Sequence, residues 1–291
     1  MFGGLGVWSR GDQRAPHKPL LVIYALARWV GGDRSDLPFG DVNRDLTGLL
    51  KEFGPPRKSQ HPEYPFWRLQ TDGVWVVRAS GGLRTRESNS DVPKGELLAH
   101  DARAGFSDEV KAPLSSDPGL AARIATLLLD RHFPESIHSE ILSSVGLSLV
   151  EVAADRKRNL AFRQKVLTAY EWRCAVCGFD VRLGTVSIAL DAAHIRWHQA
   201  GGPAEENNGL ALCVLHHKTF DLGAYTLDED GLLLVSDQAT GSVGFEEALM
   251  RHHGKRLRQA QRPEWCPSSD HLGWHAREVF KGEARHRSKT V

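Results

Sequence analysis

The sequence predicts an α+β protein of two domains. Two helical patterns followed by a hairpin-like segment fill its first part, and a strand, a loop and a helix rich in cysteine and histidine fill its last part. A segment at 148–160 that contains the charged run Asp-Arg-Lys-Arg at 155–158 separates the two. With 291 residues the chain is long enough for two hydrophobic cores. We therefore expect an N-terminal domain over 1–147, a linker over 148–160 and a C-terminal domain over 161–291.

The composition is that of an ordinary soluble globular protein, with 41% hydrophobic and 25% charged residues. No apolar run approaches the roughly 18 residues that a membrane-spanning helix needs. The first residues also lack the charged start and apolar stretch of a secretory signal. We expect a cytoplasmic protein with no membrane partner. The net charge of +1 indicates no partner by itself.

In the first part of the chain, apolar spacing predicts a core helix over 18–30 and a second helix over 40–54. Asp41 would be the N-cap of the second helix and Gly54 its stop. Two short aromatic and β-branched runs within 65–77 then surround Thr-Asp-Gly, which is a hairpin signal. Two helices and a hairpin predict a winged-helix-like start.

Further helices are expected over 118–132 and 136–145, and they close the first domain. The second domain should begin with a helix over 158–170 that leads directly to Cys174. Two basic stretches, 81–90 and 251–262, either follow a phosphate backbone or are ordinary solvated surface.

Three of the four cysteines form two ligand pairs with a histidine. The pairs are Cys174 with Cys177 and Cys213 with His216, and each has two residues between its members. Such pairs bind zinc tetrahedrally, and four protein ligands make a closed, structural site. The alternative is three buried cysteines and a surface histidine, for which the paired spacing would be coincidental. The fourth cysteine, Cys266, stands apart.

His217 follows the zinc ligand His216 directly and therefore needs a different role. On a helix it lies about 100° away from its neighbour, so it faces away from the zinc. Upstream, 187–195 reads as a buried strand that ends near His194, and 207–210 marks a turn directly before the helix of Cys213. One strand, one loop and one helix thus carry His194, Asn208 and His217 in order.

These motifs resemble the HNH endonuclease family, which has a ββα-metal fold. The resemblance covers about 165–235 and rests on C-x2-C, A-H-I, a Gly-rich loop and N-G-L-x-L-C before the two histidines. It implies that His194 is the general base, that His217 helps to hold one Mg²⁺- or Mn²⁺-like ion, and that Asn208 orients the base or completes the metal shell. Histidine suits the deprotonation of water, and a divalent cation suits a developing negative charge. A turn-forming role for Asn208 stays open.

The chain departs from the family pattern directly before the base. Many members carry a metal-binding Asp or His there, whereas this chain has Ala193. Asp191 lies one pleat back on the same strand face and is the candidate ligand. A helix N-cap or a salt bridge would explain this carboxylate equally well.

Two segments of the first domain, RAPHKPLL at 14–21 and HPEYPFWRL at 61–69, resemble the sulfur-binding domain of restriction enzymes that act on phosphorothioate-modified DNA. The resemblance implies an apolar pocket for sulfur at Tyr64 and Pro65. It implies further DNA contacts from the residues Arg14, His17, Lys18, Arg84, Arg86 and Ser88. An apolar wall favours sulfur because sulfur is less well hydrated than oxygen. From the residues alone, 64–67 reads rather as an ordinary strand start with core aromatics, and only the resemblance favours the pocket.

The two resemblances together predict a restriction endonuclease. Its partner would be double-stranded DNA with backbone phosphorothioate, which it would cut nearby with a metal-dependent HNH site. Nothing in the sequence excludes a homodimer. One alternative is an HNH endonuclease that reads a modified base such as methylcytosine, in an aromatic cage. Another is a non-catalytic, zinc-containing DNA-binding protein, which would have no need of His194.

Overall fold

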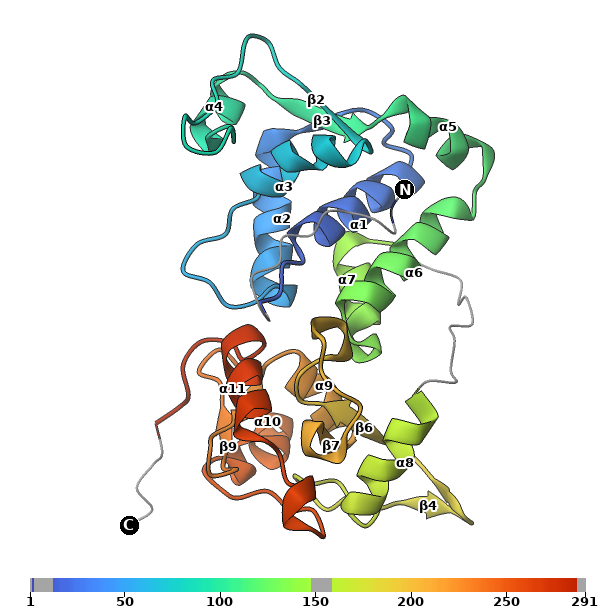
Figure 1. Ribbon diagram of the computed structural model, residues 1–291, viewed down its shortest axis with the longest axis vertical. Helices are drawn as coiled ribbons and strands as arrows, with labels where there is room; N and C mark the ends of the chain where they lie inside the picture. Colours follow the sequence, from blue (N-terminus) through green and yellow to red (C-terminus); the bar gives the residue numbers. More distant parts are fainter. Residues whose placement is uncertain (1, 3–12, 148–158, 287–291) are drawn as a thin grey trace. The chain divides into compact units, whose positions relative to one another are not determined.

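The computed structural model describes residues 2, 13–147 and 159–286. The chain folds as two compact units, Met1–Val152 and Ala153–Val291 (Figure 1). Residues 148–158 of the expected linker lie outside the described residues, and its last two residues, 159 and 160, belong to a helix. Each unit has its own hydrophobic core and is described by itself.

The N-terminal unit is built around α1 (His17–Val30), which is buried on nearly every side. A helix that is apolar all round belongs in a core, and α1 packs against α2 (Phe39–Phe53), α3 (Glu63–Arg68), α6 (Leu120–His132) and α7 (His138–Val145). The helices expected over 18–30, 40–54, 118–132 and 136–145 are therefore confirmed. Asp41 lies in the first turn of α2 and is not its N-cap, because the helix already begins at Phe39.

The sheet of this unit has three antiparallel strands in the order β1-β3-β2. They are β1 (Leu37–Pro38), β2 (Trp75–Arg78) and β3 (Arg103–Phe106), with Trp75 opposite Phe106. The short helices α4 (Lys94–Ala99) and α5 (Asp108–Ser116) flank β3 in sequence.

The hairpin expected over 65–77 is wrong. Its first half is helical, as α3 and the 3-10 turn η2 (Leu69–Asp72), and only its second half is a strand. Pro65 stands in the first turn of α3, where proline costs no hydrogen bond, and Phe66 and Leu69 are buried three residues apart on one face. The strand β2 then pairs with β3 instead of with a neighbouring strand. A winged-helix-like layout stays a prediction.

In the C-terminal unit a strand pair and a helix stand at the centre. The strands β6 (Leu190–His194) and β7 (Gly209–Cys213) pair antiparallel, and α9 (Val214–Asp221) follows β7 at once (Figure 1). The expected strand is confirmed in β6. The turn at 207–210 does not precede the helix directly, because β7 lies between them and is buried along its whole length.

The other described strands of this unit form separate two-stranded sheets and do not extend the strand pair. Helix α8 (Asn159–Ala169) confirms the helix expected over 158–170 and contacts both β6 and β7. The other elements are β4 (Arg182–Leu183), β5 (Val186–Ser187), β8 (Tyr225–Leu227), β9 (Leu233–Val235), α10 (Val243–Ala248) and α11 (Ser269–Glu278). The short 3-10 turns of the two units are η3 (Glu135–Ile137), η4 (His198–Ala200), η5 (Glu206–Asn208), η6 (Met250–His252) and η7 (Pro263–Trp265).

Helices that could cross a membrane are absent from the part of the chain that the structure describes, because none there is both long and apolar enough.

Candidate metal centre and nucleic-acid interface

The two ligand pairs of the C-terminal unit come together at one point. The ligand atoms of Cys174, Cys177, Cys213 and His216 all lie within 4.8 Å of one another. Cys213 is the N-cap residue of α9 and His216 lies in its first turn, so both point to the same side of the helix start. Three thiols and an imidazole are a donor set that suits a tetrahedral metal ion.

Contacts around His216 fix which nitrogen faces the cysteines. Its Nε2 lies 2.8 Å from the carbonyl oxygen of Ala248, to which it can donate, and its Nδ1 lies 3.1 Å from Sγ of Cys213. A second contact of this kind is what orients metal-binding histidines. Burial alone would lower the pKa of His216, but hydrogen bonds with Cys177 and Cys213 raise that pKa to about 10.

The imidazole of His194 stands at the end of β6, stacked on the ring of Phe162. Its Nε2 is buried and has no hydrogen-bond partner among the described residues. Burial lowers the pKa of His194 to about 4, and the nearby His198 adds to the effect. The imidazole is therefore neutral at neutral pH and able to accept a proton.

Asn208 is fully buried and its side chain is bound to backbone on both sides. Its Oδ1 accepts from the N–H of Arg196 at 2.8 Å, and its Nδ2 donates to the carbonyls of Arg196 and Pro203 at 3.0 and 2.9 Å. The loop passes so close that a Cβ at Gly202 would lie 1.8 Å from the Arg196 carbonyl oxygen. Asn208 thus braces the loop that follows His194.

His217 pairs with a carboxylate that the sequence reasoning missed. Its Nε2 lies 3.1 Å from Oδ2 of Asp221, four residues along α9, and the side chain of Asp221 is only 1% exposed. Asp221 also acts electrostatically on His194, whose pKa it raises against the lowering effect of burial. The four-residue spacing on one helix face is the sequence signal that could have found this residue.

Asp191, the ligand expected from the sequence, lies in a salt bridge. Its Oδ1 is 3.3 Å from Nε of Arg163 on α8, and its side chain is 48% exposed. This is the salt-bridge role that the sequence leaves open. Within the described residues, the carboxylate that contacts His217 is that of Asp221 and not that of Asp191.

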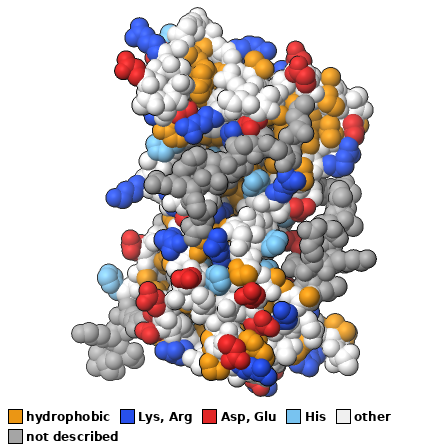
Figure 2. All heavy atoms as spheres, in the orientation of Figure 1, with side chains coloured by type: hydrophobic (Ala, Val, Ile, Leu, Met, Phe, Trp, Pro, Cys, Tyr) orange, Lys and Arg blue, Asp and Glu red, His pale blue; other side chains and the backbone are white. Residues whose placement is uncertain are grey.

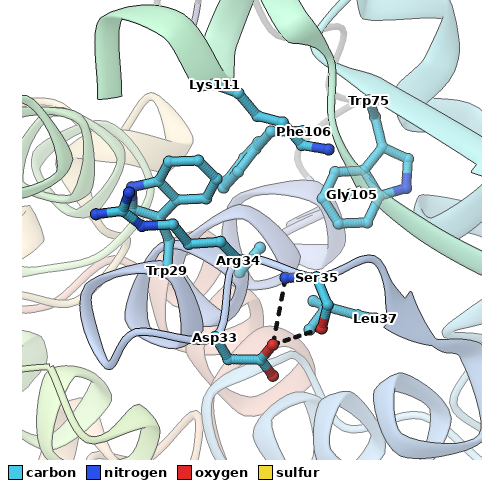
Figure 3. A pocket seen from close by; sticks show the side chains of 10 residues that line it. Trp29, Asp33, Arg34, Ser35, Leu37, Trp75, Gly105, Phe106 and Lys111 are labelled. Carbon is cyan, nitrogen blue, oxygen red and sulfur yellow. Dashed lines mark hydrogen bonds between the residues drawn. The ribbon is translucent and has the colours of Figure 1, made fainter. Parts of the chain in front are cut away.

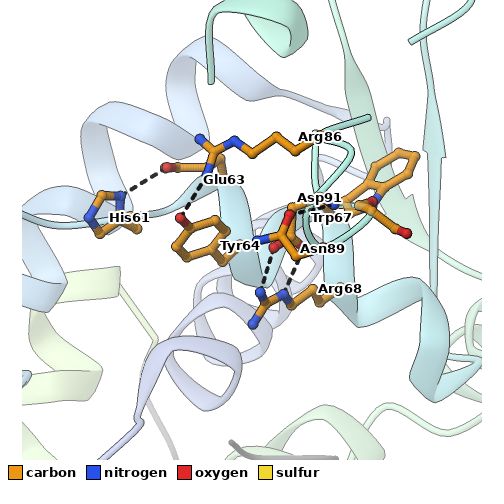
Figure 4. A network of polar contacts seen from close by, with 9 residues as sticks. His61, Glu63, Tyr64, Trp67, Arg68, Arg86, Asn89 and Asp91 are labelled. Atoms are coloured by element: carbon orange, nitrogen blue, oxygen red, sulfur yellow. Dashed lines mark hydrogen bonds and ion pairs between the residues drawn. The ribbon is translucent and has the colours of Figure 1, made fainter. Parts of the chain in front are cut away.

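In the N-terminal unit, the ring of Tyr64 lies among three basic side chains, which come from the segment before α3, from α3 itself and from the loop after β2 (Figure 4). His61 stacks on it with centroids 5.1 Å apart, and the guanidinium carbons of Arg68 and Arg86 lie 4.8 and 5.7 Å from its centroid. Arg86 also donates to the Tyr64 hydroxyl at 3.0 Å. We call this group, His61, Tyr64, Arg68 and Arg86, the tyrosine surface.

Two buried acids hold the tyrosine surface in place from beneath. Asp91 accepts from Nε and Nη2 of Arg68 at 2.7 and 2.5 Å, and Glu63 lies 2.9 Å from Nδ1 of His61 (Figure 4). Both acids are about as buried as core residues, at 2% and 3% exposed. The loop is tied to α3 once more where Nε1 of Trp67 donates to the Ser90 carbonyl.

The other residues expected at the sulfur pocket differ in their exposure. Tyr64 is half-buried, whereas Pro65 is buried in α3, so of the two the tyrosine has the accessible ring. Arg84 and Ser88 are exposed in the loop, and Arg86 is half-buried.

The basic residues at the start of α1 are engaged inside the unit. Arg14 is 9% exposed and donates to the Phe53 carbonyl at 2.8 Å. Lys18 pairs with Asp72 at 2.5 Å, and burial lowers the pKa of His17 to about 4, with Arg57 adding to the effect. Arg14 and Lys18 therefore bind groups within the unit, and His17 is neutral at neutral pH.

A cavity on the N-terminal unit is lined by Trp29, Trp75 and Phe106, with Arg34 and Lys111 at its rim (Figure 3). The three aromatic rings are each under 10% exposed. The cavity holds about 10 Å³, which is about the space of one water molecule. An extruded base would not fit there.

Basic and acidic residues are nearly equal in number in both parts of the chain. On the face that Figure 2 shows, basic and acidic side chains lie interspersed. The basic stretch at 251–262 is irregular apart from η6, and its Arg258 pairs with Glu171 at 3.3 Å. It forms no basic helix face.

Two family models match the chain. The ScoMcrA-like DNA sulfur-binding domain matches residues 1–150, and an HNH endonuclease matches residues 174–228. The first match spans more than half of the chain, and the second contains the cysteine and histidine cluster together with His194, Asn208 and His217. None of the curated proteins matches the chain.

Several solved structures are similar to the N-terminal half. The sulfur-binding domain of ScoMcrA complexed with phosphorothioated DNA is 24% identical, with a TM-score of 0.44 over 50% of this chain and 92% of that one. The sulfur-binding domain of SprMcrA, also complexed with phosphorothioated DNA, is 20% identical, with a TM-score of 0.41 over 50% and 88%. The Type IV phosphorothioation-dependent restriction endonuclease ScoMcrA is 24% identical, with a TM-score of 0.42, and the match covers 50% of this chain and 27% of ScoMcrA.

The chain thus joins a DNA sulfur-binding domain to an HNH nuclease domain in which four side chains are placed to hold a metal ion. It belongs to the ScoMcrA-like DNA sulfur-binding domain family and is a DNA endonuclease of the HNH type.

Proposed function

We propose that this chain is a restriction endonuclease that binds phosphorothioate-modified DNA through the tyrosine surface and hydrolyses a nearby phosphodiester bond at His194. The observation that carries the proposal is the presence of both matched domains in one chain. The sulfur-binding domain would bring the nuclease domain to modified DNA. The nuclease domain would then need no sequence specificity of its own. The DNA contacts of the sulfur-binding domain then decide which molecules are cut.

His194 is the proton acceptor of the reaction. Its buried Nε2 lacks a protein partner among the described residues, and its low pKa keeps it neutral. It can therefore take the proton of the water that attacks phosphorus. General-base catalysis of this kind contributes about 10²–10⁴-fold in rate.

Asn208 acts on His194 through the backbone. Its amide fixes the loop at Arg196 and Pro203, and its own carbonyl accepts from the N–H of Ile195 at 3.0 Å. Because Ile195 follows the base directly, the brace fixes the end of β6 and with it the direction of the imidazole. In this role Asn208 orients the base and is not a metal ligand.

HNH nucleases depend on a metal ion, and His217 with Asp221 fits one. An imidazole nitrogen and a carboxylate oxygen only 3.1 Å apart are suitable donors for a divalent cation such as Mg²⁺ or Mn²⁺. The carboxylate of Asp221 is nearly buried and also acts electrostatically on His194, which points the same way. When bound, the ion would stabilise the negative charge that develops on the phosphate and the leaving oxygen. We assign Asp221, in place of Asp191, as the second ligand.

The cluster of Cys174, Cys177, Cys213 and His216 is proposed to hold a structural Zn²⁺. All four positions are protein ligands, so no site remains open for a substrate or water. The ion would join the turn before β4 to the start of α9. It would thereby fix the helix that carries His217 and Asp221.

Recognition of sulfur is proposed to depend on the accessible ring of Tyr64. Sulfur is larger and less well hydrated than the oxygen it replaces, so contact with an aromatic ring favours it over ordinary phosphate. The guanidinium groups of Arg68 and Arg86 next to the ring supply positive charge for the same phosphorothioate group. The arginines would bind any phosphate, and the ring of Tyr64 would favour phosphorothioate over ordinary phosphate.

The two alternatives have less support. A reader of a modified base needs an open aromatic cage, but Phe66 and Trp75 are 0% and 2% exposed and the cavity beside Trp75 holds about 10 Å³. A zinc protein without catalysis would have no need of the arrangement of His194, His217 and Asp221.

We propose that a homodimer would cut both strands of a duplex, because each chain carries one set of His194, Asn208 and His217 within the residues described. Sedimentation analysis on a modified duplex should show two chains per cleavable site. A single chain per site together with double-strand cleavage would contradict the dimer.

Replacing the base should abolish cleavage without affecting the fold. In His194→Ala, the rate of cleavage of modified plasmid should fall by about 10²–10⁴-fold, since the proton acceptor is lost. Zinc content and affinity for modified DNA should stay unchanged. His271→Ala, a half-buried histidine on α11, is the control and should cleave normally. A cleaving His194→Ala protein would show that another group is the base.

Removing a cluster ligand should unfold the C-terminal unit. His216→Ala and Cys174→Ser should lose the single bound zinc ion, because ligand loss removes binding energy that is also folding energy, about 10–16 kcal/mol in zinc-finger peptides. Metal analysis and circular dichroism measure both effects, and binding of modified DNA by the N-terminal unit should persist. Cys266→Ser is the matched control and should keep its zinc. A His216→Ala protein that retains zinc and activity would refute the division of roles between His216 and His217.

Discrimination for sulfur should follow the ring of Tyr64. Tyr64→Ala should reduce the preference for phosphorothioate DNA by about tenfold or more, since burying such a side chain is worth about 1.5–3 kcal/mol. Tyr64→Phe should keep most of it. Arg84→Ala should weaken binding to modified and unmodified duplexes alike.

These affinities are measured by titration with duplexes that carry either phosphorothioate diastereomer or none, at two salt concentrations. The wild type should bind one diastereomer preferentially, because a shaped surface distinguishes the two configurations at phosphorus. Equal binding of all three duplexes by the wild type, or an unchanged preference in Tyr64→Ala, would refute sulfur reading at this surface.

A further inference from the structure

One face of the His194 imidazole is covered by an aromatic ring from another element. The ring of Phe162, on α8, lies 3.8 Å from it between centroids, with an interplanar angle of 16°. Phe162 is 2% exposed and belongs to the core of the C-terminal unit. The contact is thus a nearly parallel stack between a core residue and the catalytic base.

The strand opposite His194 leaves room for this ring. Gly209 of β7 is the register partner of His194. A Cβ at this glycine would lie 2.3 Å from Cγ2 of Val166 and 3.2 Å from Cζ of Phe162. Only a residue without a side chain lets α8 approach the strand pair closely enough for Phe162 to reach the imidazole.

The stack supplies an orientation that Nε2 does not obtain from hydrogen bonding. A histidine at a strand end can rotate about χ2, and general bases are often fixed by a hydrogen bond at one nitrogen. Here Nε2 has no hydrogen-bond partner among the described residues. The neighbouring ring of His198 is more distant, with centroids 6.1 Å apart and an angle of 44°.

We infer that Phe162 is a positioning residue for the cleavage reaction, which fixes the plane of the His194 ring and excludes water from one of its faces, and that Gly209 is required to admit it. The inference rests on the proposed role of His194 as general base. Phe162 itself touches neither DNA nor the reacting atoms.

A purely structural role for Phe162 would give different results from a positioning role. If the ring only filled the core, its loss would lower stability, and each folded molecule would cleave at the normal rate. If it positions the base, the chemical step slows while DNA binding is retained. The two roles are separated by measuring cleavage per folded molecule under single-turnover conditions.

The variants Phe162→Leu and Phe162→Met keep an apolar side chain at position 162 and remove the ring. With full-length, zinc-loaded protein and saturating enzyme, the single-turnover rate should fall by about 10²-fold, as expected for a misplaced catalytic group. The affinity for modified DNA should not change. Leu167→Ala, on the same helix and 0% exposed, is the control for lost packing and should cleave normally per folded molecule.

A spectroscopic measurement tests the stack without relying on the folding of any Phe162 variant. In a wild-type protein with ¹³C-labelled histidine, the ring signal that disappears in His194→Gln belongs to His194. It should lie upfield of the position of an unstacked histidine, as should the signal of His275, which stacks on Phe220, because a proton above an aromatic face is shielded. In Phe162→Leu or Phe162→Met it should move downfield.

The outcomes distinguish this inference from the function on which it rests. If His194→Ala is inactive but Phe162→Leu cleaves at the wild-type rate, or if the His194 signal has an ordinary position, the positioning role is overturned. If His194→Ala cleaves normally, the assignment of the base is wrong. A slow Phe162→Leu with unchanged DNA affinity and a downfield shift would support both.

Discussion

The arrangement of the nuclease site depends on how the chain turns at Cys213. This residue is both the last of the buried strand β7 and the N-cap of α9, and its sulfur lies 3.1 Å from Nδ1 of His216. A sulfur-rich cluster at the strand-to-helix junction fixes the rotation of the helix about its own axis. Once that rotation is set, His217 must point away from the cluster, toward the end of β6. Two adjacent histidines can therefore face two different sites only because the backbone between them is helical.

In the N-terminal unit, buried acids constrain the tyrosine surface in a comparable way. Asp91 holds Arg68 by two hydrogen bonds and Glu63 contacts His61, so each of these side chains beside the Tyr64 ring is fixed by a buried acid. The exposed surface is then rich in donors and aromatic area, although the unit carries no overall excess of charge. A surface of this kind differs from a large basic patch, which attracts any phosphate.

Much of this could be predicted from the sequence because spacing carries the information. Cysteine pairs, the order of His194, Asn208 and His217, and the long amphipathic helices all follow from local patterns. The segment at 63–72 could not, because its aromatics suit either a strand or a helix, and the prolines at 62 and 65 fit the first turn of a helix. Arg14 looks like a surface residue in sequence, but its guanidinium caps a carbonyl of Phe53 that is far away along the chain. Asp221 escapes a motif search because a lone aspartate carries no motif, and only its four-residue spacing from His217 on α9 marks it.

The hydrogen bonds of Asn208 also affect the chemical stability of this protein. Asn208 is followed by Gly209, and asparagine-glycine is the dipeptide in which the backbone nitrogen most readily attacks the side-chain amide and releases ammonia. In the folded chain the amide is buried and bound to two carbonyls, while Gly209 is held in β7 opposite His194, so this attack is sterically blocked. Deamidation would replace a donor by a carboxylate facing the carbonyl oxygens of Arg196 and Pro203, and the loop beside the base would be pushed open. Deamidation of Asn208 would therefore require this loop to open first.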